Sequence, residues 1–94
     1  MMSDEMKQLI ERAVLALKSA GASEVYLFGS AARGQMREDS DIDLAVSGLP
    51  PELFYRAGAA AEDAIGRSLD LVDLDEITPF TQYLKAESEL QRVG

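Results

Sequence analysis

The sequence predicts an α/β domain in which helices pack on a small mixed β-sheet of three or more strands. Stretches with apolar residues at helical spacing alternate along the chain with short strand-like stretches. Glycines, prolines and helix-capping residues separate these stretches. The chain has 94 residues, 47% of them hydrophobic, which is enough for one thin core. We therefore expect residues 1–94 to form a single domain.

The first third of the chain has the pattern of an amphipathic helix followed by a buried strand. Ser3 is a typical N-cap residue, and Gly21 is typical of the position just after a helix. Glu24 to Phe28 is rich in β-branched and aromatic residues, which predicts a short strand that ends at Gly29-Ser30. The apolar face of the helix is formed by Met6, Ile10, Ala13, Val14 and Leu17.

The rest of the chain predicts strand, helix, strand and helix. Asp41 to Val46 has the alternation of a strand with one apolar face. Pro51 suits the first turn of a helix, which precedes a third strand at Ser68 to Leu74. Thr78-Pro79 starts a last helix that we expect to continue to about Arg92. The larger side chains that we expect in the core of this part are Phe54, Phe80, Tyr83 and Leu84.

The composition excludes several kinds of site. The chain contains no His and no Cys, which excludes imidazole bases, thiol nucleophiles, disulfides and zinc sites built on nitrogen or sulfur. Its 9 Lys and Arg against 17 Asp and Glu give a net charge of −8, which argues against direct binding of nucleic acid. No apolar stretch approaches the roughly 18 residues that span a bilayer. We expect a cytoplasmic protein that uses carboxylates as metal ligands.

The stretch from Phe28 to Val46 contains the residues that indicate chemistry, and two familiar motifs do not fit it. Gly29 and Gly34 have the spacing of a phosphate-binding P-loop, but Gln35-Met36 stands where that loop needs Lys and Ser or Thr. An EF-hand calcium loop beginning at Asp39 fails as well, because its sixth and twelfth residues are not Gly and Glu.

A pair of carboxylates on one strand fits better. Asp41 and Asp43 are two residues apart, so their side chains share a face and their Cα atoms lie roughly 6.5–7 Å apart. Such carboxylates repel each other unless a divalent cation binds, and two cations about 3.5–4 Å apart can clamp a nucleotidyl displacement. Asp70 is our choice for a third acid, because an isolated charge between apolar strand residues is costly. The open alternatives are Asp73 as the third acid and an exposed edge position for Asp70.

Gly29 and Ser30 add a phosphate-binding element to this pair. A glycine lets a phosphate approach the backbone closely, and a Ser hydroxyl with the N–H groups of a following helical turn can bind phosphate oxygens. A Gly-Ser pair on its own is more often a simple turn. Its position shortly before Asp41 and Asp43 is what makes it informative.

The segments Gly29-Ser30, Ala32-Arg33-Gly34 and Ser40-Asp41-Ile42-Asp43-Leu44 resemble the signature of the DNA polymerase β-like nucleotidyltransferases. The short chain is similar to the minimal nucleotidyltransferases (MNT proteins) of that superfamily. The resemblance implies that Asp41, Asp43 and Asp70 are catalytic and bind Mg²⁺, with Asp43 bridging two ions and Asp70 serving the acceptor hydroxyl as metal ligand or general base. It implies that Gly29 and Ser30 grip the β- and γ-phosphates of ATP. For Arg33 it leaves open a phosphate contact and an ion pair with Asp41 or Asp43.

The resemblance also implies a reaction and a partner. An acceptor hydroxyl would attack the α-phosphorus of ATP and release pyrophosphate. MNT proteins commonly pair as antitoxins with a small helical HEPN protein, and in the best-understood arrangement they add AMP to a Tyr of that toxin. We therefore expect a Mg²⁺-dependent nucleotidyltransferase with a HEPN-type partner, or a homodimer when that partner is absent. The alternatives are a non-catalytic antitoxin that blocks its partner sterically and a nucleotidyltransferase that acts on a small molecule.

Overall fold

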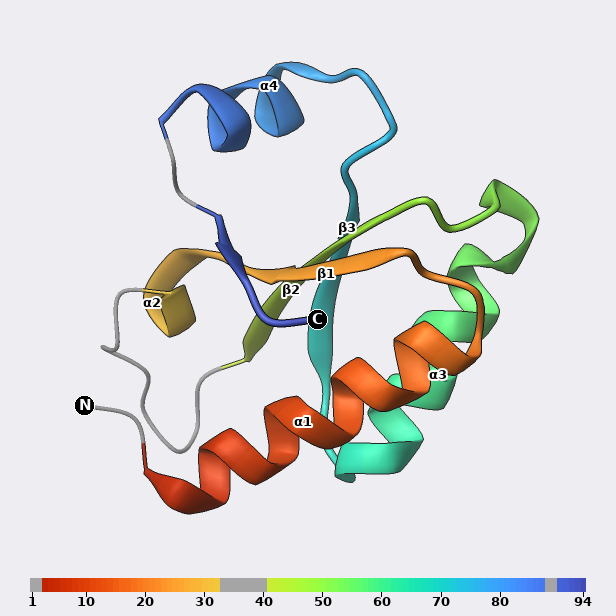
Figure 1. Cartoon of the computed structure of the whole chain (residues 1–94), viewed down its shortest axis with the longest axis vertical. Coiled ribbons are helices and arrows are strands. Elements are labelled where there is room, and N and C mark those ends of the chain that lie inside the picture. The colour runs from red at the N-terminus through yellow and green to blue at the C-terminus, as the bar shows by residue number, and fades with distance from the viewer. Residues whose placement is uncertain (1–2, 33–40, 88–89) are drawn as a thin grey trace.

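A four-stranded mixed sheet with helices on both faces makes up residues 3–32, 41–87 and 90–94, the part of the chain that the structure, a computed structural model, describes. Its elements are α1 (Asp4–Ser19), β1 (Glu24–Leu27), α2 (Gly29–Ala32), β2 (Ile42–Ser47), a 3-10 turn (Pro51–Leu53), α3 (Phe54–Ile65), β3 (Leu69–Asp73), α4 (Pro79–Ala86) and β4 (Gln91–Arg92). The strand order is β3-β2-β1-β4, with β2 and β3 parallel and the other neighbours antiparallel (Figure 1). The predicted fold class is therefore confirmed.

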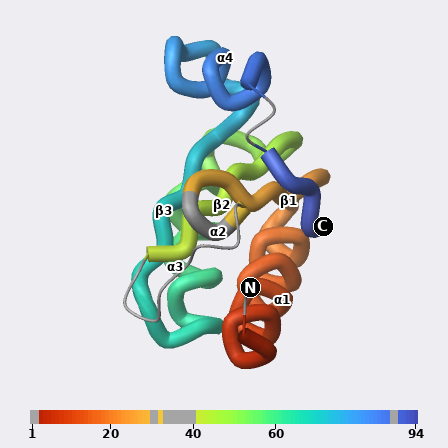
Figure 2. Tube along the Cα trace, turned by 90° about the vertical axis from the view of Figure 1, so that its left-hand side faces the viewer, coloured from red at the N-terminus to blue at the C-terminus, as the bar shows by residue number. Residues whose placement is uncertain are grey.

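The main core lies between the sheet and the helices α1 and α3, which run side by side along one face (Figure 2). The helix α1 has Ser3 as its N-cap, as expected, and the Ser3 Oγ accepts a hydrogen bond from the Met6 backbone N–H at 3.1 Å. Leu17 and Leu44 are fully buried between the two layers, and burial of such a side chain contributes about 1.5–3 kcal/mol. This core fixes which face of β2 points away from α1 and α3.

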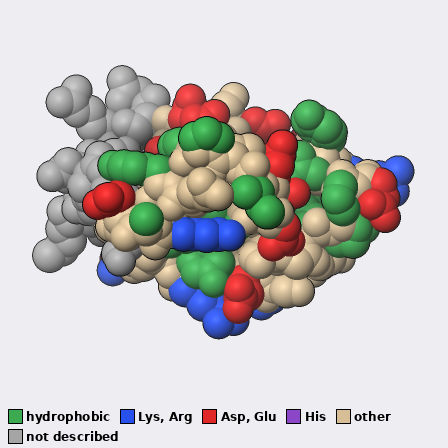
Figure 3. Space-filling model, turned by 90° about the horizontal axis from the view of Figure 1, so that it is seen from above, with side chains coloured by type: hydrophobic (Ala, Val, Ile, Leu, Met, Phe, Trp, Pro, Cys, Tyr) green, Lys and Arg blue, Asp and Glu red, His purple; other side chains and the backbone are tan. Residues whose placement is uncertain are grey.

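A smaller core covers part of the opposite face, where α4 packs. Thr78 caps α4 as predicted: its Oγ1 accepts from the Thr81 N–H at 3.1 Å, and its own N–H donates to Thr81 Oγ1 at 3.0 Å. Figure 3 looks down on this face and shows hydrophobic side chains exposed among acidic ones. The buried residues of this smaller core are Phe28, Ala45, Leu74 and Leu84.

The C-terminal part of the chain differs from the prediction. The last helix does not continue to Arg92; it ends at Ala86, and Gln91–Arg92 form β4 beside β1. The neighbouring backbone contributes to this pairing, since the Val25 N–H donates to the Gly94 carbonyl at 3.0 Å. A two-residue strand has no periodicity of its own, so only the open edge of β1 creates it. None of the described helices is long and apolar enough to cross a membrane.

The expectation that Phe80 and Tyr83 are core residues is also wrong. Their side chains are 48% and 53% exposed. The eight-residue helix α4 covers only a small area of the sheet and buries Leu84 as its main apolar contact. Phe54 packs against the main core, and Leu84 is buried, as predicted.

Candidate active site

Asp43 on β2 lies directly opposite Asp70 on β3 in the parallel register. Neighbouring strands are about 4.8 Å apart, so side chains at paired positions on one face stand next to each other. Ile42 and Leu44 point into the main core, which turns the Asp43 carboxylate to the face that carries α4. The sheet therefore brings together two acids that are far apart in the sequence.

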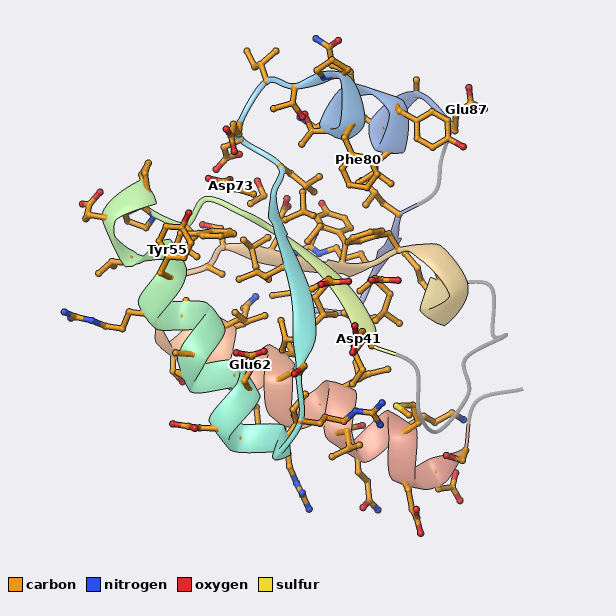
Figure 4. The ribbon with its side chains drawn as sticks, turned by 180° about the vertical axis from the view of Figure 1, so that it is seen from behind. Asp41, Tyr55, Glu62, Asp73, Phe80 and Glu87 are labelled. Atoms are coloured by element: carbon orange, nitrogen blue, oxygen red, sulfur yellow. The ribbon has the colours of Figure 1, made fainter. Side chains whose placement is uncertain are left out.

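Asp41 stands just before β2, at the end of the sheet next to α2, and is exposed (Figure 4). Asp73 lies at the far end of β3, where the register pairs it with Val46. Its Oδ1 accepts a hydrogen bond from the Asp75 N–H at 2.9 Å, which ties it to the following turn. The register thus places Asp70, and not Asp73, beside Asp43.

Gly29 lies against the Asp43 carboxylate. A Cβ atom at Gly29 would lie 2.5 Å from Asp43 Oδ2, and the φ angle of +66° is one that only glycine adopts easily. The preceding residue holds the two segments together, because the Phe28 N–H donates to the Asp43 carbonyl at 3.1 Å. The turn that starts α2 is therefore in contact with the carboxylate of Asp43.

The electrostatics of the pair are those of acids that share a site. The pKa of Asp43 is raised to about 6, first by burial and then by the negative charge of Asp70 and by a hydrogen bond between Asp70 and the protonated Asp43 carboxyl. The negative charge of Asp41 is the smallest contribution to this rise. Asp43 therefore interacts with both Asp70 and Asp41.

Oxygen donors of this kind fit Mg²⁺. Within the described residues, no three acidic side chains stand close enough together to hold a metal ion on their own. Mg²⁺ typically binds one or two carboxylates and completes its coordination with substrate phosphates and water. The pair of Asp43 and Asp70 offers such carboxylates, and binding a cation would remove their repulsion. The donor set therefore suits a cation that arrives together with phosphate.

Two of the predicted nucleotide-binding residues lie partly or wholly outside the described structure. The backbone of Ser30 forms the second residue of α2, but its side chain is not described. Arg33 lies outside the described residues altogether. Gly29 is the one residue of this predicted group whose contact with the acids is seen.

Glu62 on α3 is a residue near this site that the sequence did not indicate. Its Oε2 accepts a hydrogen bond from the Leu69 N–H at 3.1 Å, at the first residue of β3 and next to Asp70 (Figure 4). The contact holds the start of β3 against α3. A Glu among the other charged residues of an amphipathic helix gives no sign of such a role.

A hollow of about 540 Å³ lies elsewhere, between α1 and the edge formed by β1 and β4. Its lining includes Ile10, Val14 and Leu27, which belong to the main core or pack against it. This hollow therefore opens on the other face of the sheet from Asp43 and does not belong to the site.

Comparison with known proteins gives the family. A family model described as "Polymerase beta, Nucleotidyltransferase" matches residues 14–91, a range that contains Gly29 and all three acids. No curated protein sequence matches the chain significantly. A solved structure assigned to a minimal nucleotidyltransferase has a TM-score of 0.69 and 29% sequence identity, over 94% of this chain and 93% of that chain.

Two toxin–antitoxin structures share the fold at lower identity. A toxin–antitoxin complex with AMP-PNP has a TM-score of 0.70 and 22% identity, over 96% of this chain and 72% of that chain. The complex of a tri-AMPylated Shewanella oneidensis HEPN toxin with its MNT antitoxin has a TM-score of 0.64 and 20% identity, over 92% and 69% of the chains. Since the family model covers most of the sequence and the fold agrees, the chain belongs to the polymerase beta nucleotidyltransferase family.

Proposed function

We propose that this protein is a Mg²⁺-dependent nucleotidyltransferase that transfers AMP from ATP to a Tyr hydroxyl of a small helical HEPN-type toxin, and so acts as its antitoxin. The observation that carries the proposal is the pairing of Asp43 with Asp70 against the turn at Gly29. Membership of the family supports nucleotidyl transfer. The structural relatives with AMP-PNP and with an AMPylated HEPN toxin support ATP as donor and such a toxin as acceptor.

Each residue of the site has a proposed role. Asp41 and Asp43 would hold Mg²⁺, and the turn at Gly29-Ser30 would bind the β- and γ-phosphates. Arg33 binds phosphate or orients Asp41 or Asp43 through an ion pair. When bound, Mg²⁺ neutralises phosphate charge and lowers the pKa of a hydroxyl in its coordination shell.

The proposed reaction needs no His or Cys. The acceptor oxygen forms a bond to the α-phosphorus of ATP, and the bond from that phosphorus to the oxygen shared with the β-phosphate breaks. Pyrophosphate leaves with the electron pair of that bond. Asp70 would take the proton of the acceptor hydroxyl as general base, or it would help to hold Mg²⁺ beside that hydroxyl, in which case the proton passes to water. Positioning and charge neutralisation supply most of the catalysis in reactions of this kind.

The open side of the site supports an acceptor on another protein. Asp41 and Asp70 are exposed, so a bulky acceptor can approach them. The net charge of −8 favours a basic partner and speeds the encounter with it. We therefore assign the acceptor to a partner chain rather than to a small molecule enclosed by this one.

The test mixes the purified protein, ATP labelled at the α-phosphate, Mg²⁺ and a HEPN-type protein as acceptor. Transfer of label to a Tyr of the partner is expected for the wild type and for Asp63→Asn, a matched loss of charge at an exposed position on α3. The double variant Asp41→Asn with Asp43→Asn should transfer none. Absence of transfer by the wild type would overturn the proposal, and neutralisation of the toxin by the double variant would favour steric blocking.

A further inference from the structure

An aromatic side chain is left half exposed on the same face of the sheet as the acids. Phe80 projects from the side of α4 that faces the sheet, and 48% of its surface is exposed (Figure 4). Tyr83, which follows one helical turn later and is 53% exposed, widens the same apolar edge. The smaller core is completed by Leu84 without either ring. The smaller core is therefore formed without burying either ring.

Phe80 is held next to the segment that carries the proposed phosphate-binding turn. Its ring meets that of Phe28 edge-on, with the centroids 5.8 Å apart and the planes at 70°. Phe28 immediately precedes Gly29, and its N–H is bonded to the Asp43 carbonyl at 3.1 Å. A single ring therefore separates Phe80 from the backbone that positions both the glycine turn and the acid.

The layers of the fold restrict where the rest of a nucleotide can lie. The helices α1 and α3 cover the other face of the sheet, so a nucleotide whose phosphates sit at Gly29 extends over the face that carries α4. Tyr26 also belongs to this face, but its hydroxyl donates to Glu24 Oε1 at 2.8 Å and its ring lies against the smaller core. Phe80 is the aromatic residue of this face that is both half exposed and in contact with the segment that leads into the turn.

We propose that the Phe80 ring is the platform on which the base of a bound nucleoside triphosphate stacks. In ATP this base is the purine adenine. The inference rests on the proposed nucleotidyltransferase function and adds the element that binds the base. Stacking on an aromatic ring uses the π-face that every base has, so Phe80 contributes affinity with little choice between bases. Tyr83 extends the platform.

The test compares two ligands that share phosphates and differ in the base. Isothermal titration with Mg²⁺ present measures the Kd of ATP and of inorganic tripolyphosphate for the wild type, Phe80→Ala and Phe80→Leu. Phe80→Ala should weaken ATP binding between about 5-fold and 100-fold and leave tripolyphosphate binding unchanged. Phe80→Leu keeps an apolar side chain against Phe28, so it should fold normally and still lose most of the ATP affinity.

Tyr55→Ala is the matched control, because it removes an aromatic ring that is 86% exposed on α3 and leaves α4 intact. It should bind both ligands like the wild type. Wild-type affinity for ATP in both Phe80 variants would overturn the proposal that Phe80 binds the base. An equal loss of ATP and tripolyphosphate binding would overturn it as well, because Phe80 would then only support the turn. A wild type that binds neither ligand would instead remove the proposed function and the platform together.

Discussion

Asp43 and Asp70 occupy paired positions on the adjacent parallel strands β2 and β3, and their carboxyl groups interact directly. Gly29 stands so close to Asp43 that no other residue fits there without displacing its carboxylate. A pair of acids arranged in this way costs stability when nothing is bound. A bound cation would relieve the repulsion between the two carboxylates, and this relief favours cation binding.

Removal of the charge of Asp43 should therefore stabilise the protein. The folded pKa of about 6 lies above the ordinary value of 3.8, so the folded state holds this proton more tightly than the unfolded state. The favourable contribution of Asp43 is complete below about pH 4 and is lost as the pH rises through about 6. Asp43→Asn should gain about 1 kcal/mol at pH 7.5, a modest figure because solvent screens a half-buried group.

Thermal melting between pH 4 and pH 8 measures this effect. The difference in Tm between Asp43→Asn and the wild type should be roughly 5 °C at pH 7.5 and should shrink towards zero near pH 4. Asp63→Asn should show no such pH dependence. A lower Tm for Asp43→Asn at pH 7.5 would contradict the unfavourable pairing.

Binding of Mg²⁺ should stabilise the wild type in a way that depends on Asp43. A ligand that binds only the folded state raises the free energy of unfolding, and protons compete with a metal for its carboxylate ligands. Mg²⁺ together with a non-hydrolysable ATP analogue should therefore raise the Tm more at pH 7.5 than at pH 5. A chelator should remove the gain. An equal rise in Asp43→Asn would show that the cation binds elsewhere.

Gly29→Ala tests the close approach of the turn to the acid. Both Gly29 and Gly66 have a left-handed backbone, with φ of +66° and +69°, but a Cβ at Gly66 would meet nothing within 4 Å. Each alanine variant should lose about 1–2 kcal/mol of stability from backbone strain. Only Gly29→Ala should also lose transfer activity, by at least about tenfold, since a misplacement of about 1 Å can cost a hundredfold. Equal activity of the two variants would mean that this contact has no catalytic importance.

Much of the site follows from local signals in the sequence. The alternation through Ile42, Asp43 and Leu44 indicates which side chains share a face, and the caps at Ser3 and Thr78 place two helices. The choice of Asp70 as third acid came from the expected cost of an isolated charge within a strand, but Asp70 is exposed on the edge strand β3, so that cost does not arise and the open alternative of an exposed edge position describes its surroundings. It remains a proposal as a catalytic residue, although the register now shows it opposite Asp43.

Features that depend on contacts between distant segments were not visible in the sequence. The strand β4 exists because β1 has an open edge, and nothing in Gln91–Arg92 distinguishes it from the end of a helix. The exposure of Phe80 depends on how little of the sheet α4 covers, which helical spacing cannot show. Glu62 acquires its contact with Leu69 only when α3 packs beside β3.

Glu62 should act as a positioning residue for Asp70. Glu62→Ala leaves the Leu69 N–H without its acceptor, which should cost about 1–2 kcal/mol of stability. It should also lower kcat and leave the KM for ATP nearly unchanged, because the start of β3 loosens while the phosphate-binding turn stays in place. Glu62→Gln retains an amide oxygen and should recover most of both losses. Asp63→Ala, at the next residue of α3, is the control for changes in helix content. If Glu62→Gln does not recover stability and kcat, the positioning role is contradicted.

The most direct test of the central claim is a double-mutant cycle on kcat/KM for AMP transfer to the partner, with Asp43→Asn, Asp70→Asn and both together. If the two carboxylates act as one unit, each single variant should lose at least about a hundredfold, and the double variant should be no slower than the worse single variant. Effects that multiply in the double variant, or an Asp70→Asn variant with wild-type kcat/KM, would contradict the paired site.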